Sequence, residues 1–245
     1  EASYQAPKAE SFNVSKDGGK SIVKVTYRFP QVDAQWEITY KVFANGIIKV
    51  DNRFVAEGTE TPMIPRVGLR MQLSEILNDL TYYGRGPEEN YRDRRTSQFI
   101  GEYTTPIKDL YEPYIRPQEN EHRTDIYWCA LTTKQKAGLL FIADRTFELN
   151  ASNYLLGSLD SGETIDNGAP RTNETNHRHL TDPQPVKQVD MFIDYRMMGV
   201  GGDNSWGAIA HEPYLIRPGV ENAIEYGFSI VPFDKKADYK NLIYQ

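Results

Sequence analysis

Apolar and polar side chains alternate with a period of two along much of this chain. Residues 23–29 place Val, Tyr and Phe at every second position, with Lys, Thr and Arg between them, and residues 36–42 repeat the pattern. A β-strand directs successive side chains to opposite faces, so this period predicts strands with one buried face. Asn45-Gly46 follows the second segment and favours a tight hairpin turn. Further strands are predicted at 47–50, 67–73, 80–83, 126–131, 138–143, 147–151, 186–195 and 223–232.

The rest of the pattern favours a fold with little helix. No segment sustains a 3.6-residue period, and Ser74–Asn78 is at most a single turn. Residues 84–125 form a long, weakly patterned region, of the kind that carries function or covers a sheet. The first 20 residues offer no independent core. We therefore predict an all-β fold of antiparallel sheets packed face to face, in one domain over residues 1–245.

Composition and charge exclude two classes of partner. The chain of 245 residues carries a formal net charge of −6 and has no block of Lys and Arg, which argues against binding to nucleic acid. No apolar run is long enough for a transmembrane helix, so we expect no membrane partner, and residues 1–8 lack the features of a signal peptide. The single cysteine, Cys129, lies between Trp128 and Ala130 and is predicted to be a buried, unreactive thiol.

The segment Gly199–Trp206 carries the most informative signal for function. Three glycines and an Asp-Asn pair, residue types that tolerate a positive φ, precede the tryptophan. An irregular turn that ends in an indole is suited to presenting a flat stacking surface to a ligand. From the residues themselves a second interpretation is equally open, in which Trp206 fills the end of a sheet.

Three further segments combine charge with aromatic residues, glycine or proline. They are Gly84–Arg94, Tyr114–Arg123 and Glu174–Leu180. With Gly199–Trp206 they follow one another in an order that resembles the C-terminal domain, also called the small chain, of β-galactosidases of glycoside hydrolase family 2. The matching positions are Gly84, Gly86, Pro87, Glu89, Asn90, Tyr91, Asp93, Arg94, Tyr114, Pro117, Glu119, Asn120, Arg123, Glu174, Thr175, His177, Arg178, His179, Leu180, Gly199, Gly201, Gly202, Asp203, Ser205 and Trp206.

The resemblance runs from about residue 65 to the end of the sequence and, more weakly, back to its start. Asn204 stands where the family commonly has Asp, and Glu88 stands where Gln is common. The resemblance implies a β-supersandwich similar to that of galactose mutarotases. It also implies that the chain is a single domain cut from a longer enzyme, which hydrolyses terminal non-reducing β-D-galactosides such as lactose with retention of configuration.

The two catalytic glutamates of such enzymes belong to a (β/α)₈ barrel domain. This sequence lacks the alternating strand and helix patterns of a barrel. The resemblance therefore implies no catalytic residue in this chain, and we expect the chain to be inactive by itself. It implies no cofactor here either, although a divalent cation can bind in the barrel domain of the full enzyme.

The resemblance implies a specific place for Trp206. In the family, the tryptophan at this position reaches into the active site of the barrel domain and forms part of the aglycone subsite. The loop that would support it consists of Gly201, Gly202, Asp203, Asn204 and Ser205. The implied partners are the remaining domains of the same polypeptide, a galactoside or aglycone sugar, and further copies in a homo-oligomer. A bacterial enzyme of this kind would act in the cytoplasm or the periplasm.

The glutamates of these segments receive a structural interpretation. Glu88 and Glu89 are adjacent, so an extended backbone would direct them to opposite faces. Arg85, Arg92 and Arg94 lie close by in the sequence, as does a further arginine at position 95. We predict a network of ion pairs and hydrogen bonds, because buried carboxylates need cationic or N–H partners. Its expected members are Glu89, Asn90, Asp93, Arg94, Glu119, Arg123, His177 and His179.

Two other interpretations of the histidines stay open. On a strand His177 and His179 would share a face and could bind a metal, although we expect none. The further ligands would come from Asp182, His122 and Glu119. Either histidine with Glu174 or Glu119 could also act as the acid and base of a sugar epimerase. The alternative to a galactosidase domain is therefore a free-standing carbohydrate-binding module or a mutarotase-like epimerase.

Overall fold

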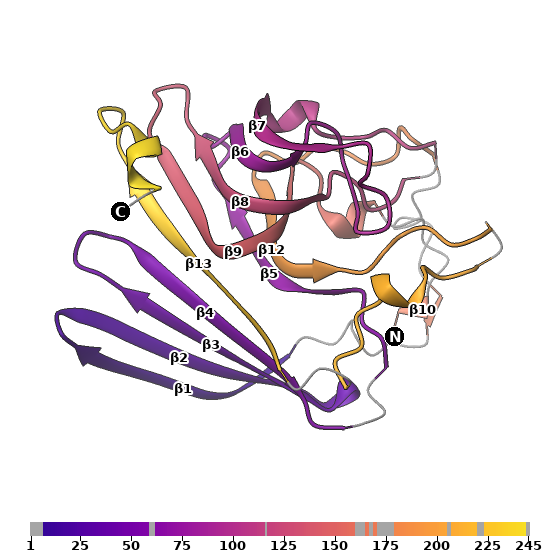
Figure 1. Cartoon of the computed structure of the whole chain (residues 1–245), viewed down its shortest axis with the longest axis horizontal. Helices are drawn as coiled ribbons and strands as arrows, with labels where there is room; N and C mark the ends of the chain where they lie inside the picture. Colours follow the sequence, from indigo (N-terminus) through magenta and orange to yellow (C-terminus); the bar gives the residue numbers. More distant parts are fainter. Residues whose placement is uncertain are drawn as a thin grey trace.

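Antiparallel β-strands make up almost all the regular structure, which confirms the all-β prediction. The computed structural model describes residues 7–58, 62–115, 117–159, 165–166, 169–170, 179–204, 207–219 and 223–243. Eleven strands belong to one hydrogen-bonded sheet (Figure 1). They are β1 (Lys8–Asp17), β2 (Lys20–Phe29), β3 (Ala34–Val42), β4 (Ile48–Ala56), β5 (Arg66–Leu73), β6 (Asp79–Gly86), β7 (Phe99–Pro106), β8 (Arg123–Thr132), β9 (Gly138–Ser152), β12 (Val189–Met197) and β13 (Ile224–Phe233). The short strands β10 (Ile165–Asp166) and β11 (Ala169–Pro170) form a separate pair.

Helical structure in the described residues is limited to short 3₁₀ turns. These are η2 (Pro30–Val32), η3 (Ile107–Asp109), η4 (Leu156–Ser158), η6 (Glu212–Tyr214) and η7 (Tyr239–Leu242). Within the same residues, no helix has both the length and the apolar content needed to cross a membrane.

Strand β9 connects two layers of the sheet. The strand order is β1-β2-β3-β4-β13-β9-β8-β6-β7, and β12 lies between β9 and β5. The first half of β9 pairs with β13 as far as Ala143, whereas Glu148–Ser152 pair with β12. The sheet therefore forks in the middle of β9. Figure 1 shows β1–β4 diverging from the layer that contains β5, β6, β8 and β12.

The main hydrophobic core lies between the two layers. Ile38 and Val50 contribute to it from β3 and β4, and Tyr82, Ile126 and Met191 contribute from β6, β8 and β12. Each of these side chains is at most 4% exposed. Because burying one such side chain contributes about 1.5–3 kcal/mol, the face-to-face packing of the alternating apolar positions is the main stabilising term.

Most of the predicted strands are confirmed, with one merger. The predicted segments 138–143 and 147–151 are the two halves of β9. The polar residues Asp144, Arg145 and Thr146 interrupt the apolar pattern and are exposed at the fork. The interruption thus marks the point where β9 passes between layers, and not the end of a strand. The hairpin prediction is also confirmed, since Gly46 has a φ of 86° in the turn between β3 and β4.

Two strands of the large sheet were missed by the sequence pattern, and each lies at an edge of that sheet. β1 contains no buried residue, and β7, which lies in the region predicted as a loop, contains none either. An edge strand has a neighbour on one side, so its side chains need not follow a strict alternation. Cys129 is fully buried, as predicted, and burial raises the pKa of its thiol.

The β8–β9 hairpin provides a direct test of this packing. A Cβ atom at Gly138 would overlap the carbonyl oxygen of Leu131 and lie 2.9 Å from the ring of Phe233. We predict that Gly138→Ala lowers the free energy of unfolding by about 1–3 kcal/mol, because main-chain atoms must move. The matched control is Gly157→Ala, where a Cβ would have no neighbour within 4 Å. Urea unfolding measures both; equal stability of the two variants would contradict the packing argument.

Candidate functional site

The glycine-rich loop between β12 and η6 is held by a carboxylate from another of the sequence segments. Asp93 accepts a hydrogen bond from the N–H of Val200 at 3.2 Å and from the N–H of Gly201 at 2.8 Å. The N–H of Gly199 donates to the carbonyl of Tyr214 at 2.8 Å. Asp93, which lies 108 positions before Gly201, therefore holds the base of the loop. The carbonyl of Tyr214 holds the same part of the loop through Gly199.

Close contacts, and not a positive φ, explain two of the glycines. A Cβ at Gly199 would lie 2.5 Å from Asp93 Oδ2, and a Cβ at Gly202 would lie 2.8 Å from the Ala208 side chain. Among the described residues of this loop, Gly207 has a positive φ of 97°, and Gly199, Gly201 and Gly202 do not. The glycines let the backbone approach its neighbours closely.

The tip of the loop is exposed to solvent. Asp203 Oδ1 lies 2.8 Å from His211 Nε2, and both side chains are more than half exposed. Asn204 is also exposed. Ser205 and Trp206, the residues to which the sequence assigns the presentation of an aromatic surface, lie outside the described residues. The loop is described up to Asn204 and again from Gly207.

Glu89 joins the first and second sequence segments. It accepts from Arg94 at 2.5 Å, from the hydroxyl of Tyr114, and from the N–H of Glu121 at 2.9 Å. The Glu89 side chain is only 13% exposed, so these three donors supply the hydrogen bonds that water would otherwise make. Asn90 accepts from the hydroxyl and the N–H of Thr124 and is fully buried.

A buried polar cluster lies beneath these segments. Glu119 accepts from Tyr91 at 2.7 Å, from Arg66 at 3.1 Å and from Asn150 at 2.8 Å. Burial and the negative charge of Glu119 both raise the pKa of the Tyr91 hydroxyl, so Tyr91 stays protonated and donates. His122 stacks on the Tyr91 ring with centroids 5.3 Å apart.

His122 extends the cluster to the end of β12. Its ring nitrogens lie 2.7 Å from Asn150 Oδ1 and 3.0 Å from Glu148 Oε2. Burial acts to lower the pKa of His122, but the hydrogen bond and charge of Glu148 outweigh it, so the pKa is raised overall. Glu148 also accepts from the N–H of Met197 at 2.6 Å. The cluster therefore binds the strand that leads directly into the glycine-rich loop.

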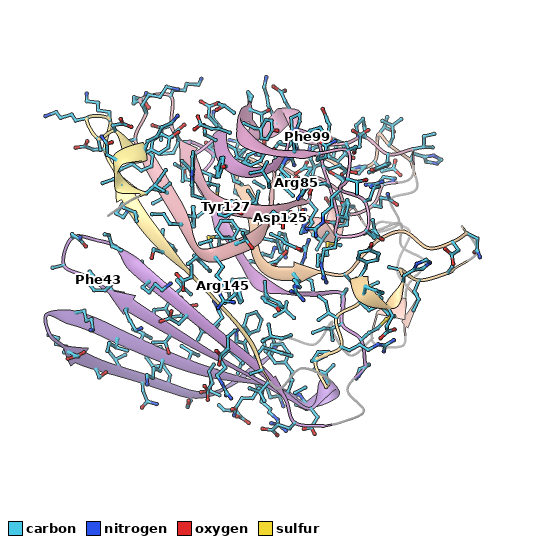
Figure 2. All side chains as sticks on the ribbon, in the orientation of Figure 1. Phe43, Arg85, Phe99, Asp125, Tyr127 and Arg145 are labelled. Carbon is cyan, nitrogen blue, oxygen red and sulfur yellow. The ribbon has the colours of Figure 1, made fainter. Side chains whose placement is uncertain are left out.

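Arg85 of the first segment and the neighbouring Arg95 pair with a carboxylate that the sequence did not identify. Arg85 and Arg95 lie 2.7 and 2.9 Å from Asp125 Oδ2, and Figure 2 shows Arg85 beside Asp125. Of the predicted network, Arg94 contacts Glu89, whereas Asp93 contacts the glycine-rich loop. Arg123 donates to the carbonyls of Glu121 and Pro87 and to the Tyr82 hydroxyl.

Other members of the cluster also have no local signal in the sequence. Arg66, Glu148 and Asn150 lie on β5 and β9, outside all four sequence segments. Their positions are set by strand pairing, since β12 pairs with both β5 and β9. A single sequence does not reveal such long-range register, and only the alternation of polar residues such as Glu148 and Asn150 among buried apolar ones hinted at it.

The histidine alternatives are only partly covered by the structure. His177 and Glu174 lie outside the described residues. His179 is exposed, and its N–H donates to Asp182 at 2.9 Å. His122 and Glu119 are engaged within the buried cluster. Among the residues that the structure describes, no group of three or more His, Cys, Asp or Glu side chains is arranged to hold a metal ion.

A polar cleft of about 760 Å³ lies at the fork of the sheet. Residues 144–146 of β9, Tyr195 and Arg196 of β12, and residues 225–227 of β13 line it, together with side chains of β3 and β4. Several of its charges are paired, as in the Arg53–Glu225 contact at 3.2 Å. None of the residues singled out in the sequence lines this cleft.

The comparisons with known proteins identify the family. The family described as "Beta galactosidase small chain" matches residues 1–230. The chain belongs to this family. It is 31% identical to a beta-galactosidase of Priestia megaterium over 195 residues, which cover 80% of this chain and 17% of that protein. It is 28% identical to a beta-galactosidase of Halalkalibacterium halodurans over 233 residues, covering 94% of this chain and 21% of that one. The chain thus spans about a fifth of the length of these relatives.

Similar solved structures have low sequence identity to this chain. An aldose epimerase homologue from C. elegans has a TM-score of 0.42 at 10% identity and covers 91% of this chain and 68% of its own. An alpha-galactosidase from Geobacillus stearothermophilus has a TM-score of 0.41 at 11% identity and covers 94% and 28%.

The contact between Asp93 and the loop can be tested by amide hydrogen exchange. Asp93→Ala removes the acceptor for two N–H groups, so exchange at Val200 and Gly201 should become faster by about tenfold or more. Asp203→Ala is the matched control, because the Asp203 carboxylate contacts the exposed side chain of His211 and, among the described residues, accepts no hydrogen bond from the N–H of Val200 or Gly201. Unchanged exchange in Asp93→Ala would show that the loop is held in another way.

The buried Glu121 carboxyl predicts a dependence of stability on pH. Burial raises its pKa to about 8, although Arg123 opposes the shift, and no described residue donates a hydrogen bond to its Oε2. Between about pH 5 and 8 the folded chain keeps a proton that the unfolded chain releases, so the free energy of unfolding falls as the pH rises. Asp194, whose pKa burial raises to about 7, acts in the same direction.

The measurement is urea unfolding at several pH values. Glu121→Gln should make the decline in stability with pH shallower without abolishing it, because Asp194 remains. Glu102→Gln is the control, since Glu102 is exposed and paired with Lys240. A decline as steep in Glu121→Gln as in the unsubstituted chain would mean that Glu121 is ionised throughout.

Proposed function

We propose that this chain is the C-terminal domain of a retaining β-galactosidase, which hydrolyses terminal non-reducing β-D-galactosides such as lactose. In this proposal the chain supplies one wall of the active-site mouth and structural support, and the catalytic carboxylates come from a barrel domain of the same polypeptide. Family membership and the length of the beta-galactosidase relatives support this division of labour.

The observation that carries the proposal is the convergence of the sequence segments on the glycine-rich loop. Asp93 of the first segment holds the loop backbone, and Glu89 ties that segment to the second. The buried cluster around His122 fixes Met197, two residues before the loop begins. A rigid base of this kind is what an exposed aromatic side chain needs if it is to bind a sugar without a large loss of conformational entropy.

Exposed apolar side chains beside the loop support docking against another domain. Val200 is 47% exposed and Ile209 is 51% exposed, on either side of Trp206 in the sequence. We propose that this face packs against the barrel domain, so that Trp206 becomes part of the aglycone subsite. The apolar face of a sugar ring stacks well on an indole, and burying roughly 100 Å² would contribute about 2.5 kcal/mol.

The proposal is tested in the full-length polypeptide that contains this chain. Trp206→Ala should weaken the binding of glucose-type acceptors and of lactose about thirtyfold, which corresponds to a loss of about 2 kcal/mol. Binding of an inhibitor that fills only the galactose subsite should change little. The 245-residue chain by itself should not hydrolyse a chromogenic β-galactoside, because it lacks the barrel carboxylates.

Two variants separate stacking from general damage to the loop. Trp206→Phe should recover part of the acceptor binding, whereas Val200→Ala should leave the affinity of the galactose subsite unchanged. Equal losses at both subsites in Trp206→Ala would point to a folding defect. No loss at either subsite would return Trp206 to the role of a residue that fills the end of a sheet.

A further inference from the structure

Strand β1 forms one end of the large sheet. Among the residues that the structure describes, its main chain pairs with β2 alone, and its other side has no strand beside it. Its central segment, Ser11–Ser15, has no charged residue, proline or glycine. Soluble proteins usually protect such an edge with charges, prolines or a cover, because free N–H and C=O groups recruit another strand. The charges of β1 lie toward its two ends, whereas the edge strand β7 carries Glu102, paired with Lys240, near its centre and ends at Pro106.

The apolar side chains of β1 are exposed although they continue the core face of the sheet. Phe12 and Val14 lie opposite Val25 and Val23 in the register with β2. Val25 is 8% exposed, whereas Phe12 is 66% exposed and Val14 is 61% exposed. The second layer therefore covers this face as far as β2 and not at β1. A partner strand beside β1 would extend the sheet and bring apolar side chains next to Phe12 and Val14.

The central segment of β1 is self-complementary in the antiparallel direction. With Asn13 on a two-fold axis, Phe12 of one copy faces Val14 of the other, Ser11 faces Ser15, and Asn13 faces Asn13. Apolar residues then meet only apolar residues, and polar residues meet only polar ones.

Neighbouring registers fit less well. A two-fold axis at Phe12 would bring Lys8 opposite Lys16, and an axis at Val14 would bring Phe12 opposite Lys16. With the axis at Asn13, Lys16 of each copy instead lies close to Glu10 of the other copy. The irregularity between Ala9 and Ser11 limits regular pairing to Ser11–Ser15.

We propose that β1 is a dimerisation surface that takes a second copy of this chain, with the two β1 strands paired antiparallel about Asn13. The dimer joins the two large sheets into one. Main-chain hydrogen bonds provide the attachment, and the two symmetric Phe12–Val14 contacts select the register.

The first test is the oligomeric state of the 245-residue chain. Light scattering after size exclusion, at loading concentrations from about 5 to 200 µM, should show a shift from monomer toward dimer. Phe12→Lys and Val14→Glu should each weaken dimerisation about tenfold or more, because each places a charge opposite an apolar residue twice per dimer. Ile76→Lys is the matched control, because Ile76 is 60% exposed and lies in the turn after β5. This variant should dimerise like the unsubstituted chain.

The second test addresses the register. A mixture of Phe12→Lys with Val14→Glu should form a heterodimer more tightly than either variant associates with itself. In that heterodimer the introduced ammonium faces the introduced carboxylate across the axis, and the remaining contact is Phe12 with Val14. Circular dichroism of each variant shows whether the strands are retained.

Several outcomes would overturn the proposal. A chain that stays monomeric at the highest concentration would mean that β1 is free or covered by another part of a longer polypeptide. Dimers that resist both single substitutions would place the interface elsewhere. Failure of the mixed variants to associate more tightly than the single ones would reject the register centred on Asn13.

Discussion

The passage of β9 from one layer of the sheet to the other is the constraint on which the rest of the structure depends. Its first half pairs with β13 and its second half with β12, so it belongs to both layers. The two layers are thereby joined through main-chain hydrogen bonds, and the core between them can close only around this strand. The exposed polar residues 144–146 mark the crossing, because at the fork the strand has lost β13 as a neighbour and has not yet reached β12.

The same strand carries the polar groups that position the glycine-rich loop. Glu148 and Asn150 point into a largely buried region, where they must be hydrogen-bonded if the fold is to be stable. His122 and Glu119, from one segment, and Arg66, from β5, satisfy them. A network of this kind is sensitive to the loss of any member, since the remaining groups would be buried without partners. It therefore fixes the exit of β12, and Asp93 then fixes the loop.

This arrangement separates support from chemistry. The carboxylates of Glu89, Asp93 and Glu119 accept hydrogen bonds from arginines, an amide, hydroxyls and main-chain N–H groups, which suits a structural role better than proton transfer. For Glu121 an ionised state is costly because the carboxyl is buried, and no described residue donates a hydrogen bond to its Oε2. Function, in our proposal, depends on presenting one loop to another domain. Apolar side chains of that loop and of β1 are exposed, and these are the two surfaces for which we propose partners.

The sequence determined the class of fold and the family, because a period of two and four ordered motifs are local properties that one chain displays directly. The hairpin at Asn45-Gly46 and the burial of Cys129 follow from the same local rules. The edge strands β1 and β7 escaped detection, since few or none of their side chains are buried and alternation is a signature of burial. Only the tertiary structure decided that Asp93 holds the glycine-rich loop, that Asp125 binds two arginines, and that Arg66, Glu148 and Asn150 form the supporting cluster. These contacts depend on the register between strands far apart in the sequence, and strand register is set by the packing of the whole sheet.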